Sequence, residues 1–263
     1  DNISTDNIST TSSNGTGGTI NLDSDNDITT ATLDASGHIS GGTINLQSAG
    51  QINTNGIIAS SENGQGGTIN LNSDSNILTT AILNVSGKTN GGNITFDAVG
   101  NITTNTISFG SNNGQGGTIN FNSDGNISTA LLNGLSNTDG GDITFQSTGK
   151  ITTQNILTNG VNGDGGDIHL TSGNEIITGI LNALSNGAGG NITLNAPGNI
   201  TTQTIIASGA NGNGGTIDID SGGSITILND TITNQGSISS FSSNGNGGNI
   251  TLNAATNINT GSL

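Results

Sequence analysis

The chain has 263 residues, of which 45 are glycine, and it contains no cysteine, methionine, tryptophan or tyrosine. Eighteen acidic residues against two lysines give a net charge of −16, so the chain lacks the basic surface that nucleic acids and anionic membrane surfaces require. The absence of cysteine excludes disulfides and thiolate metal sites, and no apolar run reaches the roughly 20 residues of a membrane span. We therefore expect no nucleic-acid partner and no membrane insertion.

Paired glycines divide the chain into repeats of nearly constant length. From the first glycine of one pair to the first of the next, the spacing is 24 or 25 residues eight times and 33 residues once. A period this regular is typical of a repeat architecture. The pairs begin at Gly17, Gly41, Gly66, Gly91, Gly116, Gly140, Gly165, Gly189, Gly214 and Gly247.

Each repeat reads as three short strands. An alternating run such as TINL at 19–22 follows the glycines, and after a turn come a second run such as NIT at 101–103 and a third such as TII at 204–206. Alternation with a period of two, bounded by Gly and Asn, predicts β-strands. The sequence therefore predicts an all-β fold, a right-handed parallel β-solenoid or β-helix of about ten coils with three strands each. Residues 1–263 form a single solenoid segment in this prediction.

Apolar residues recur at equal positions of successive coils. The third and eleventh residues after the first glycine are Ile in all ten coils, and the fifth is Leu, Phe or Ile. Because equal positions stack in a solenoid, these columns predict the core. In the fifth column we expect Phe96, Phe121 and Phe145 to form one aromatic stack. A fourth column, beginning with Leu33 and Ile57, lines the third strand.

Threonine and glycine mark the corners. The thirteenth position is Thr in nine of ten coils, and we expect its hydroxyl to point inward and bond the neighbouring coil. The ninth position is Gly in six coils and Asn in two, residues that tolerate a positive φ. Pro197 directly precedes Gly198, which predicts a type II turn. The Gly-Gly pairs are predicted to be tight corners with no room for a side chain.

The ninth coil is longer than the others. Its 33 residues place an insertion near 229–236, which we expect to form a loop or an extra strand pair. If the chain holds a local binding site, we expect it at this insertion, with Phe241 as an anchor. Neither end of the chain reads as a cap, so we expect a segment of a longer chain or a unit that stacks end to end.

Four aspartates predict a metal site. Asp139 precedes one glycine pair and Asp164 the next, while Asp142 and Asp167 follow them at equal positions. In each stacked pair the two carboxylates lie about 4.8 Å apart and repel each other. A hard cation such as Ca²⁺ would relieve that repulsion. The alternative is that these are solvated acids that keep rods apart.

A second, weaker calcium candidate is the acidic turn DSDND at 23–27, where three aspartates lie on one side. Apart from calcium, we expect no cofactor.

The motifs GGTINFNSDGNIST at 116–129 and GGNITLNAPGNITT at 189–202 carry a resemblance. They resemble the repeats of large bacterial surface proteins, those of filamentous haemagglutinin-type exoproteins and of cyanobacterial proteins with GGxI repeats. The resemblance implies export to the cell surface, by two-partner secretion, and work as a stalk or adhesin. The partners it suggests are further copies of the chain, end to end or side by side, a longer flanking chain, and a surface glycan or cell receptor.

The leading functional hypothesis is a structural or adhesive rod of a bacterial cell surface or extracellular fibre, because the coils are uniform. Two alternatives stay open. Ice binding is suggested by the outward Thr and Asn pairs of the first strands, such as Thr43 and Asn45, although Asp142, Asp167 and His169 interrupt them. A polysaccharide-active β-helix enzyme would need convergent carboxylates and sugar-holding aromatics or basic residues. His169 beside Asp167 is the best candidate for such chemistry and His38 a lesser one, and we predict no enzymatic activity.

Overall fold

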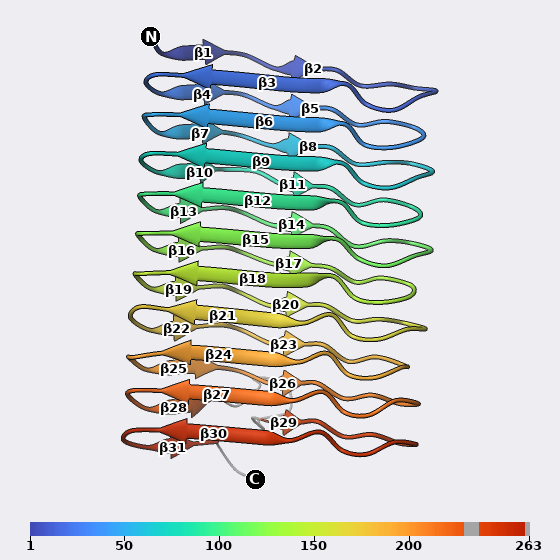
Figure 1. Ribbon diagram of the computed structural model, residues 1–263, viewed down its shortest axis with the longest axis vertical. Coiled ribbons are helices and arrows are strands. Elements are labelled where there is room, and N and C mark those ends of the chain that lie inside the picture. The colour runs from blue at the N-terminus through green and yellow to red at the C-terminus, as the bar shows by residue number, and fades with distance from the viewer. Residues whose placement is uncertain (229–236, 261–263) are drawn as a thin grey trace.

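The computed structural model describes residues 1–228 and 237–260. Within them every regular element is a β-strand, and all strand pairs belong to three parallel sheets (Figure 1). Each complete coil contributes one strand to each sheet, so the predicted parallel β-solenoid with three strands per coil is confirmed. Among the described residues, no helix has the length and apolar character needed to cross a membrane.

Sheet 1 collects the first and longest strand of each coil. Its ten strands are β3 (Thr19–Ser24), β6 (Thr43–Ser48), β9 (Thr68–Ser73), β12 (Asn93–Ala98), β15 (Thr118–Ser123), β18 (Asp142–Ser147), β21 (Ile168–Ser172), β24 (Ile192–Ala196), β27 (Ile217–Ser221) and β30 (Ile250–Ala254).

Sheet 2 collects the second strands. Its eleven strands are β1 (Ile3–Thr5), β4 (Ile28–Thr30), β7 (Ile52–Thr54), β10 (Ile77–Thr79), β13 (Ile102–Thr103), β16 (Ile127–Ser128), β19 (Ile151–Thr152), β22 (Ile176–Ile177), β25 (Ile200–Thr202), β28 (Ile225–Ile227) and β31 (Ile258–Asn259).

Sheet 3 collects the third strands, of two residues each. Its ten strands are β2 (Ile8–Ser9), β5 (Leu33–Asp34), β8 (Ile57–Ile58), β11 (Leu83–Asn84), β14 (Ile107–Ser108), β17 (Leu132–Asn133), β20 (Ile156–Leu157), β23 (Leu181–Asn182), β26 (Ile205–Ile206) and β29 (Ile238–Ser239).

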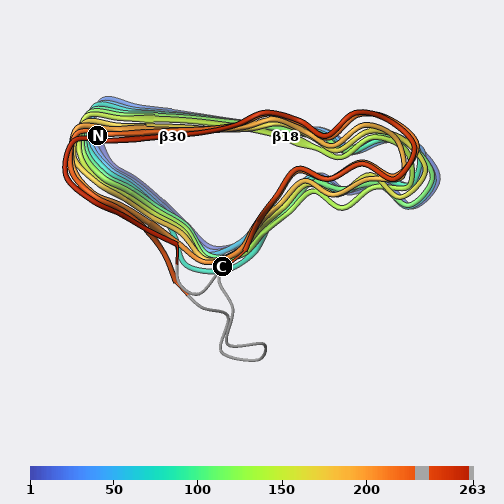
Figure 2. The ribbon, with the colours of Figure 1, turned by 90° about the horizontal axis from the view of Figure 1, so that it is seen from below.

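Seen along the axis, the coils superpose in a three-sided cross-section with a narrow lobe on one side (Figure 2). The lobe lies between each strand of sheet 3 and the next strand of sheet 1, where the chain runs out and returns. Its two walls are joined close to the body, because Gly42 N–H donates to the carbonyl of Ala35 at 2.7 Å. Followed from below, the chain runs counter-clockwise as it approaches the viewer, which makes the solenoid right-handed (Figure 2).

The predicted core columns are confirmed by the strand register. Ile94 pairs with Ile119 and Ile119 with Ile143, and this in-register stacking continues along sheet 1. The three predicted phenylalanines form a parallel stack, with ring centroids 4.6 Å apart for Phe96 and Phe121 and 4.7 Å apart for Phe121 and Phe145. The inward-facing aliphatic side chains of the three sheets are fully or almost fully buried in all but the end coils.

The glycines differ from the prediction in one respect. None of the glycines in the described part of the chain has a φ in the left-handed region, so the type II turn expected at Pro197 and Gly198 is wrong. Close approach of neighbouring coils explains the glycine instead: a Cβ on Gly198 would lie 2.4 Å from the carbonyl oxygen of Asn174. The Gly-Gly pairs lie at the neck of the lobe, where a Cβ on Gly41 would lie 2.0 Å from the carbonyl oxygen of Ala59.

The threonine column points inward as predicted, but most of its hydroxyls do not bond a neighbouring coil. Thr153 Oγ1 donates to the carbonyl of the next residue, Gln154, at 3.0 Å. Only Thr202, among the column positions with a described hydrogen bond, donates to the preceding coil, at 2.9 Å from Gly179 O. In five coils the hydroxyl donates to the carbonyl of the next residue in its own chain, and Thr54 and Thr79 Oγ1 are buried without a partner.

A column of buried serines couples the coils instead, and the sequence reasoning missed it. Ser123 Oγ donates to Gly100 O of the preceding coil at 2.7 Å and accepts Gly125 N–H at 3.1 Å. The signal was present, since the seventh position after the first glycine is Ser in seven coils and Ala in three. The same donation to the preceding turn is made by Ser24, Ser48, Ser73, Ser147, Ser172 and Ser221.

The long ninth coil keeps the register of the stack. Strand β28 ends at Ile227, and β29 begins at Ile238, which pairs with Ile205 of the coil before it. The predicted insertion at 229–236 lies outside the described residues. Phe241, its expected anchor, is 63% exposed and its N–H donates to Ser208 Oγ.

Candidate functional site

The outward face of sheet 1, the sheet with the longest strands, carries the residues on which the ice-binding alternative rests. Each coil presents three outward side chains there, in three columns along the axis. Shallow hollows follow the second and third columns from β3 to β18. The hollows are lined by aliphatic and aromatic residues and by outward polar residues. The polar residues are Asn21, Asp23, Asn45, Gln47, Asn70, Asn72, Thr95, Asp97, Asn120, Asn122, Thr144 and Gln146.

Amide side chains on this face bond one another from coil to coil. Asn45 Nδ2 donates to Asn21 Oδ1 at 2.8 Å, and Asn70 Nδ2 donates to Asn45 Oδ1 at 2.8 Å. In the third column Asn122 Nδ2 donates to Asp97 Oδ1 at 3.0 Å. These bonds hold the side chains in fixed, repeating positions, so the face offers hydrogen-bonding groups at every coil.

The predicted aspartate pairs do stack, and each carboxylate has a structural partner. Asp142 Oδ1 accepts Asp167 N–H at 2.8 Å, and Asp167 Oδ1 accepts Asn191 N–H at 2.7 Å. Asp139 Oδ1 accepts Asp164 N–H at 2.9 Å in the same manner. Each aspartate thus satisfies a backbone donor of the next coil where the regular ladder is interrupted.

Asp142 is the acid most affected by this crowding. The residue is exposed, yet its carboxylate is partly shielded from water, and this desolvation raises its pKa above the ordinary value. The N–H of Asp167 opposes that rise in pKa, while the negative charges of Asp167 and Asp139 add to it. Desolvation, with the neighbouring negative charges adding to it, therefore makes the ionised form of Asp142 less favourable in the folded chain than in water.

No three His, Asp or Glu side chains gather into a group able to hold a metal ion within residues 1–228 and 237–260. The four aspartates are two stacked pairs in adjacent coils, with their Oδ1 atoms directed at backbone N–H groups. Calcium binding at Asp139, Asp142, Asp164 and Asp167 stays a prediction, and the N–H bonds explain without a metal why acids are tolerated there.

Asp27, in the acidic turn at 23–27, is explained in the same way. Asp27 Oδ1 accepts Gln51 N–H of the next coil at 2.9 Å. Further along this column, Asn76 and Asn101 make the same bond to the coil that follows each of them. Asp27 therefore occupies an asparagine position of a structural ladder.

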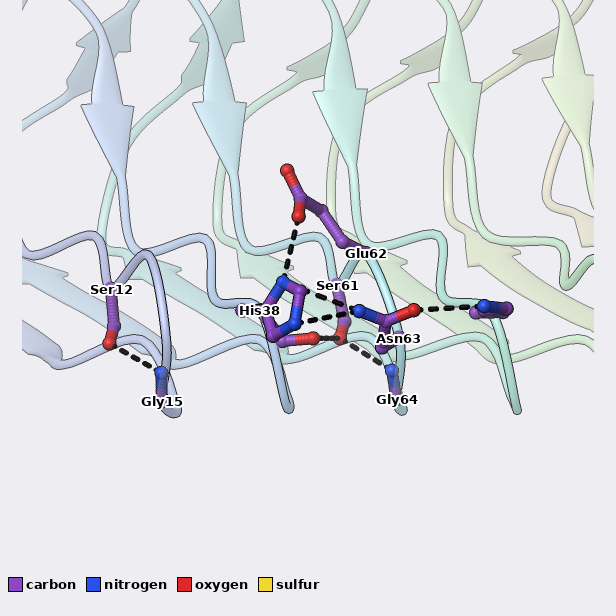
Figure 3. A network of polar contacts seen from close by, with 8 residues as sticks. Ser12, Gly15, His38, Ser61, Glu62, Asn63 and Gly64 are labelled. Carbon is purple, nitrogen blue, oxygen red and sulfur yellow. Dashed lines mark hydrogen bonds and ion pairs between the residues drawn. The ribbon is translucent and has the colours of Figure 1, made fainter.

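A polar cluster on the lobe connects three coils, and sequence reasoning did not find it (Figure 3). His38 Nδ1 lies 2.9 Å from Glu62 Oε2, and its Nε2 lies 2.8 Å from Asn63 Nδ2. Lys88 Nζ donates to Asn63 Oδ1 at 2.8 Å, which directs the amide NH₂ toward the ring. Nε2 then accepts and Nδ1–H donates to Glu62. A 24-residue spacing of His38 and Glu62 was the available signal.

His169, the best catalytic candidate from the sequence, lies on the outward face of β21. Its ladder neighbours are Thr144 and Thr193, and its Nε2 is 3.3 Å from Thr171 Oγ1. The structure therefore surrounds it with hydroxyl groups of the same face. Asp167, two residues earlier, uses its Oδ1 for the backbone of the next coil.

Comparison with known protein families, with curated proteins and with solved structures finds no match to this chain. Its function is therefore inferred from its geometry.

Proposed function

We propose that this chain is a structural rod of a cell surface or an extracellular fibre. One observation carries the proposal: three parallel sheets run through the stack, with Ile on Ile along sheet 1 and, in seven of the ten coils, Ser bonded to a backbone carbonyl of the preceding turn. A catalytic site needs one coil that differs from its neighbours, whereas a spacer needs all coils alike. Ten coils at about 4.8 Å make a rod about 50 Å long.

The cell-surface location and the adhesive role rest on the resemblance of the repeats to bacterial surface proteins. The composition is compatible with both, because a net charge of −16 opposes non-specific association in solution. A glycan or receptor would meet the outward face of sheet 1, where amide groups recur in eight of the ten coils.

The test measures whether the chain is a rigid spacer of countable coils. Because the chain has no cysteine, Thr19→Cys with Asn249→Cys introduces two unique spin labels in one column of sheet 1, nine coils apart. We expect a single narrow distance of about 43 Å. Deleting residues 66–115 removes one two-coil unit and should shorten the distance by about 9.6 Å. A broad distribution, or an unchanged distance after the deletion, would contradict the proposal.

Ice binding is a second candidate, favoured by the bonded amide ladder of Asn21, Asn45 and Asn70 beside a column of threonines. The ladder fixes a flat polar array over three coils. Thermal hysteresis of the chain tests it, and its loss in Asn45→Lys, which places a charge at the centre of the ladder, is the expected result.

A further inference from the structure

The outer face of sheet 3 and of the adjoining lobe wall changes character half-way along the rod. In the N-terminal coils its outward side chains include Asp34, His38, Glu62 and Lys88. From β17 onward the outward side chains are aliphatic, aromatic or polar, and none of them is acidic or basic. We name this second part the neutral patch, and its large apolar members are Leu135, Leu157, Val161, Leu184, Ile206 and Phe241.

Four of the six large apolar residues of the neutral patch are exposed, Leu157 and Ile206 are half-buried, and the patch is free of charge. Leu135 and Leu184 are 41% and 43% exposed, and Val161 and Phe241 are 58% and 63% exposed. The five coil segments that form it, 133–137, 157–161, 182–186, 206–210 and 239–243, contain no Asp, Glu, Lys or Arg, although the chain carries eighteen acids. It is therefore a surface on which another −16 rod can approach without placing acid against acid.

The relief of the patch alternates from coil to coil. Along its middle column Leu135, Asn159, Leu184, Ser208 and Phe241 stack in this order, because β17, β20, β23, β26 and β29 are in register. Large apolar residues thus alternate with small or polar ones at a two-coil period of about 9.6 Å.

Such a pattern fits itself. A second copy displaced by one coil sets each apolar ridge over a polar hollow, and a two-fold axis lets both copies use the same patch. In a partner whose ridges and hollows repeat at a different spacing, the ridges would no longer lie over the hollows after a few coils.

We propose that the neutral patch is a lateral contact between two copies of this chain. The proposal builds on the function as a rod, since sideways pairing is how rods form a fibre. The patch spans roughly 24 Å by 16 Å, or about 400 Å² per copy. That is about half of the roughly 800 Å² that each partner buries in a standard stable interface, so one contact is weak and reversible.

Sedimentation equilibrium of the full chain, up to about 1 mM in 0.5 M NaCl to screen the acids, tests the association. We expect a monomer–dimer equilibrium that weakens at least tenfold in Leu184→Asp, which places a carboxylate at the centre of the patch. Val99→Asp is the matched control, because Val99 is 57% exposed but lies outside the patch, and it should associate like the wild type. A chain that stays monomeric, or a Leu184→Asp variant that associates normally, overturns the proposal.

A second measurement locates the contact. Asn186 and Asn112 are exposed and occupy the same column, the first inside the neutral patch and the second in an earlier coil outside it. Under mild oxidation, Asn186→Cys should form a disulfide-linked dimer much faster than Asn112→Cys, and equal rates contradict the assignment. A monomeric chain that still gives the 43 Å spin-label distance would remove the lateral contact and leave the rod function intact.

Discussion

Phe109 fills the space above Gly134 in the next coil. A Cβ added to Gly134 would lie 2.5 Å from both Cε2 and Cζ of the Phe109 ring, which is fully buried. In this column Val85 precedes Phe109 and Thr158 follows Gly134. The largest side chain of the four, Phe109, is therefore followed by a residue that has no side chain. The two residues compensate for each other in volume.

The first prediction concerns this pair. Gly134→Ala should lower the unfolding free energy by about 1–3 kcal/mol, because the buried ring has little room to move. Phe109→Val alone should cost a similar amount through the cavity that it leaves. The double variant should cost less than the sum of the two, and thermal melting of all four proteins measures this coupling. Additive costs would show that the ring and the glycine are independent.

The second prediction concerns the serine column. Ser123→Ala removes a buried hydroxyl that bonds Gly100 O and Gly125 N–H, and should cost about 1–3 kcal/mol. The reverse change, Ala98→Ser, should raise the melting temperature, since it completes the column in a coil that lacks it. Ser128→Ala, on the outward side of β16, is the control and should change the melting temperature little. Equal effects at 123 and 128 would contradict the coupling role.

The third prediction is a pH dependence at Asp142. Because the pKa of its carboxyl group is raised in the folded chain, the group destabilises the fold once it is ionised. That penalty is complete above the folded pKa and disappears as pH falls through it toward the unfolded value of 3.8.

Asp142→Asn should therefore raise the free energy of unfolding at pH 7 by up to about 1 kcal/mol. The melting temperature should rise with it. The asparagine keeps the acceptor for Asp167 N–H, as Asn191 does for Thr216 N–H at 2.9 Å. The gain should vanish near pH 3. Asp25→Asn, at an exposed turn, removes the same charge and is the matched control for net charge. A gain that persists at pH 3 would not come from this ionisation.

The fourth prediction tests calcium. If Asp139, Asp142, Asp164 and Asp167 bind Ca²⁺ with millimolar affinity, 10 mM calcium should raise the unfolding free energy by about 1.4 kcal/mol relative to EDTA. The variant with Asp142→Asn and Asp167→Asn should lose this increase. An identical melting temperature in calcium and EDTA, or the same shift in the variant, removes the site.

The Ile and Phe columns show how far periodicity reaches. Parallel strands that stack in register place equal positions of successive coils directly over one another, because backbone hydrogen bonds define the 4.8 Å step. A constant period is therefore enough to predict which residues meet, as Phe96, Phe121 and Phe145 do. The stacked aspartates were predictable for the same reason.

The period by itself determined the solenoid, its three strands and its core, since these depend only on contacts between equal positions. Contacts between unequal positions were decided by the tertiary structure. The lobe brings Gly42 to Ala35, Ser123 bonds the carbonyl of Gly100 in the turn of the preceding coil, and a turn glycine is needed because a neighbouring backbone is close. How near two such segments come depends on the path of the chain between them, and a repeat of residue types does not specify that path.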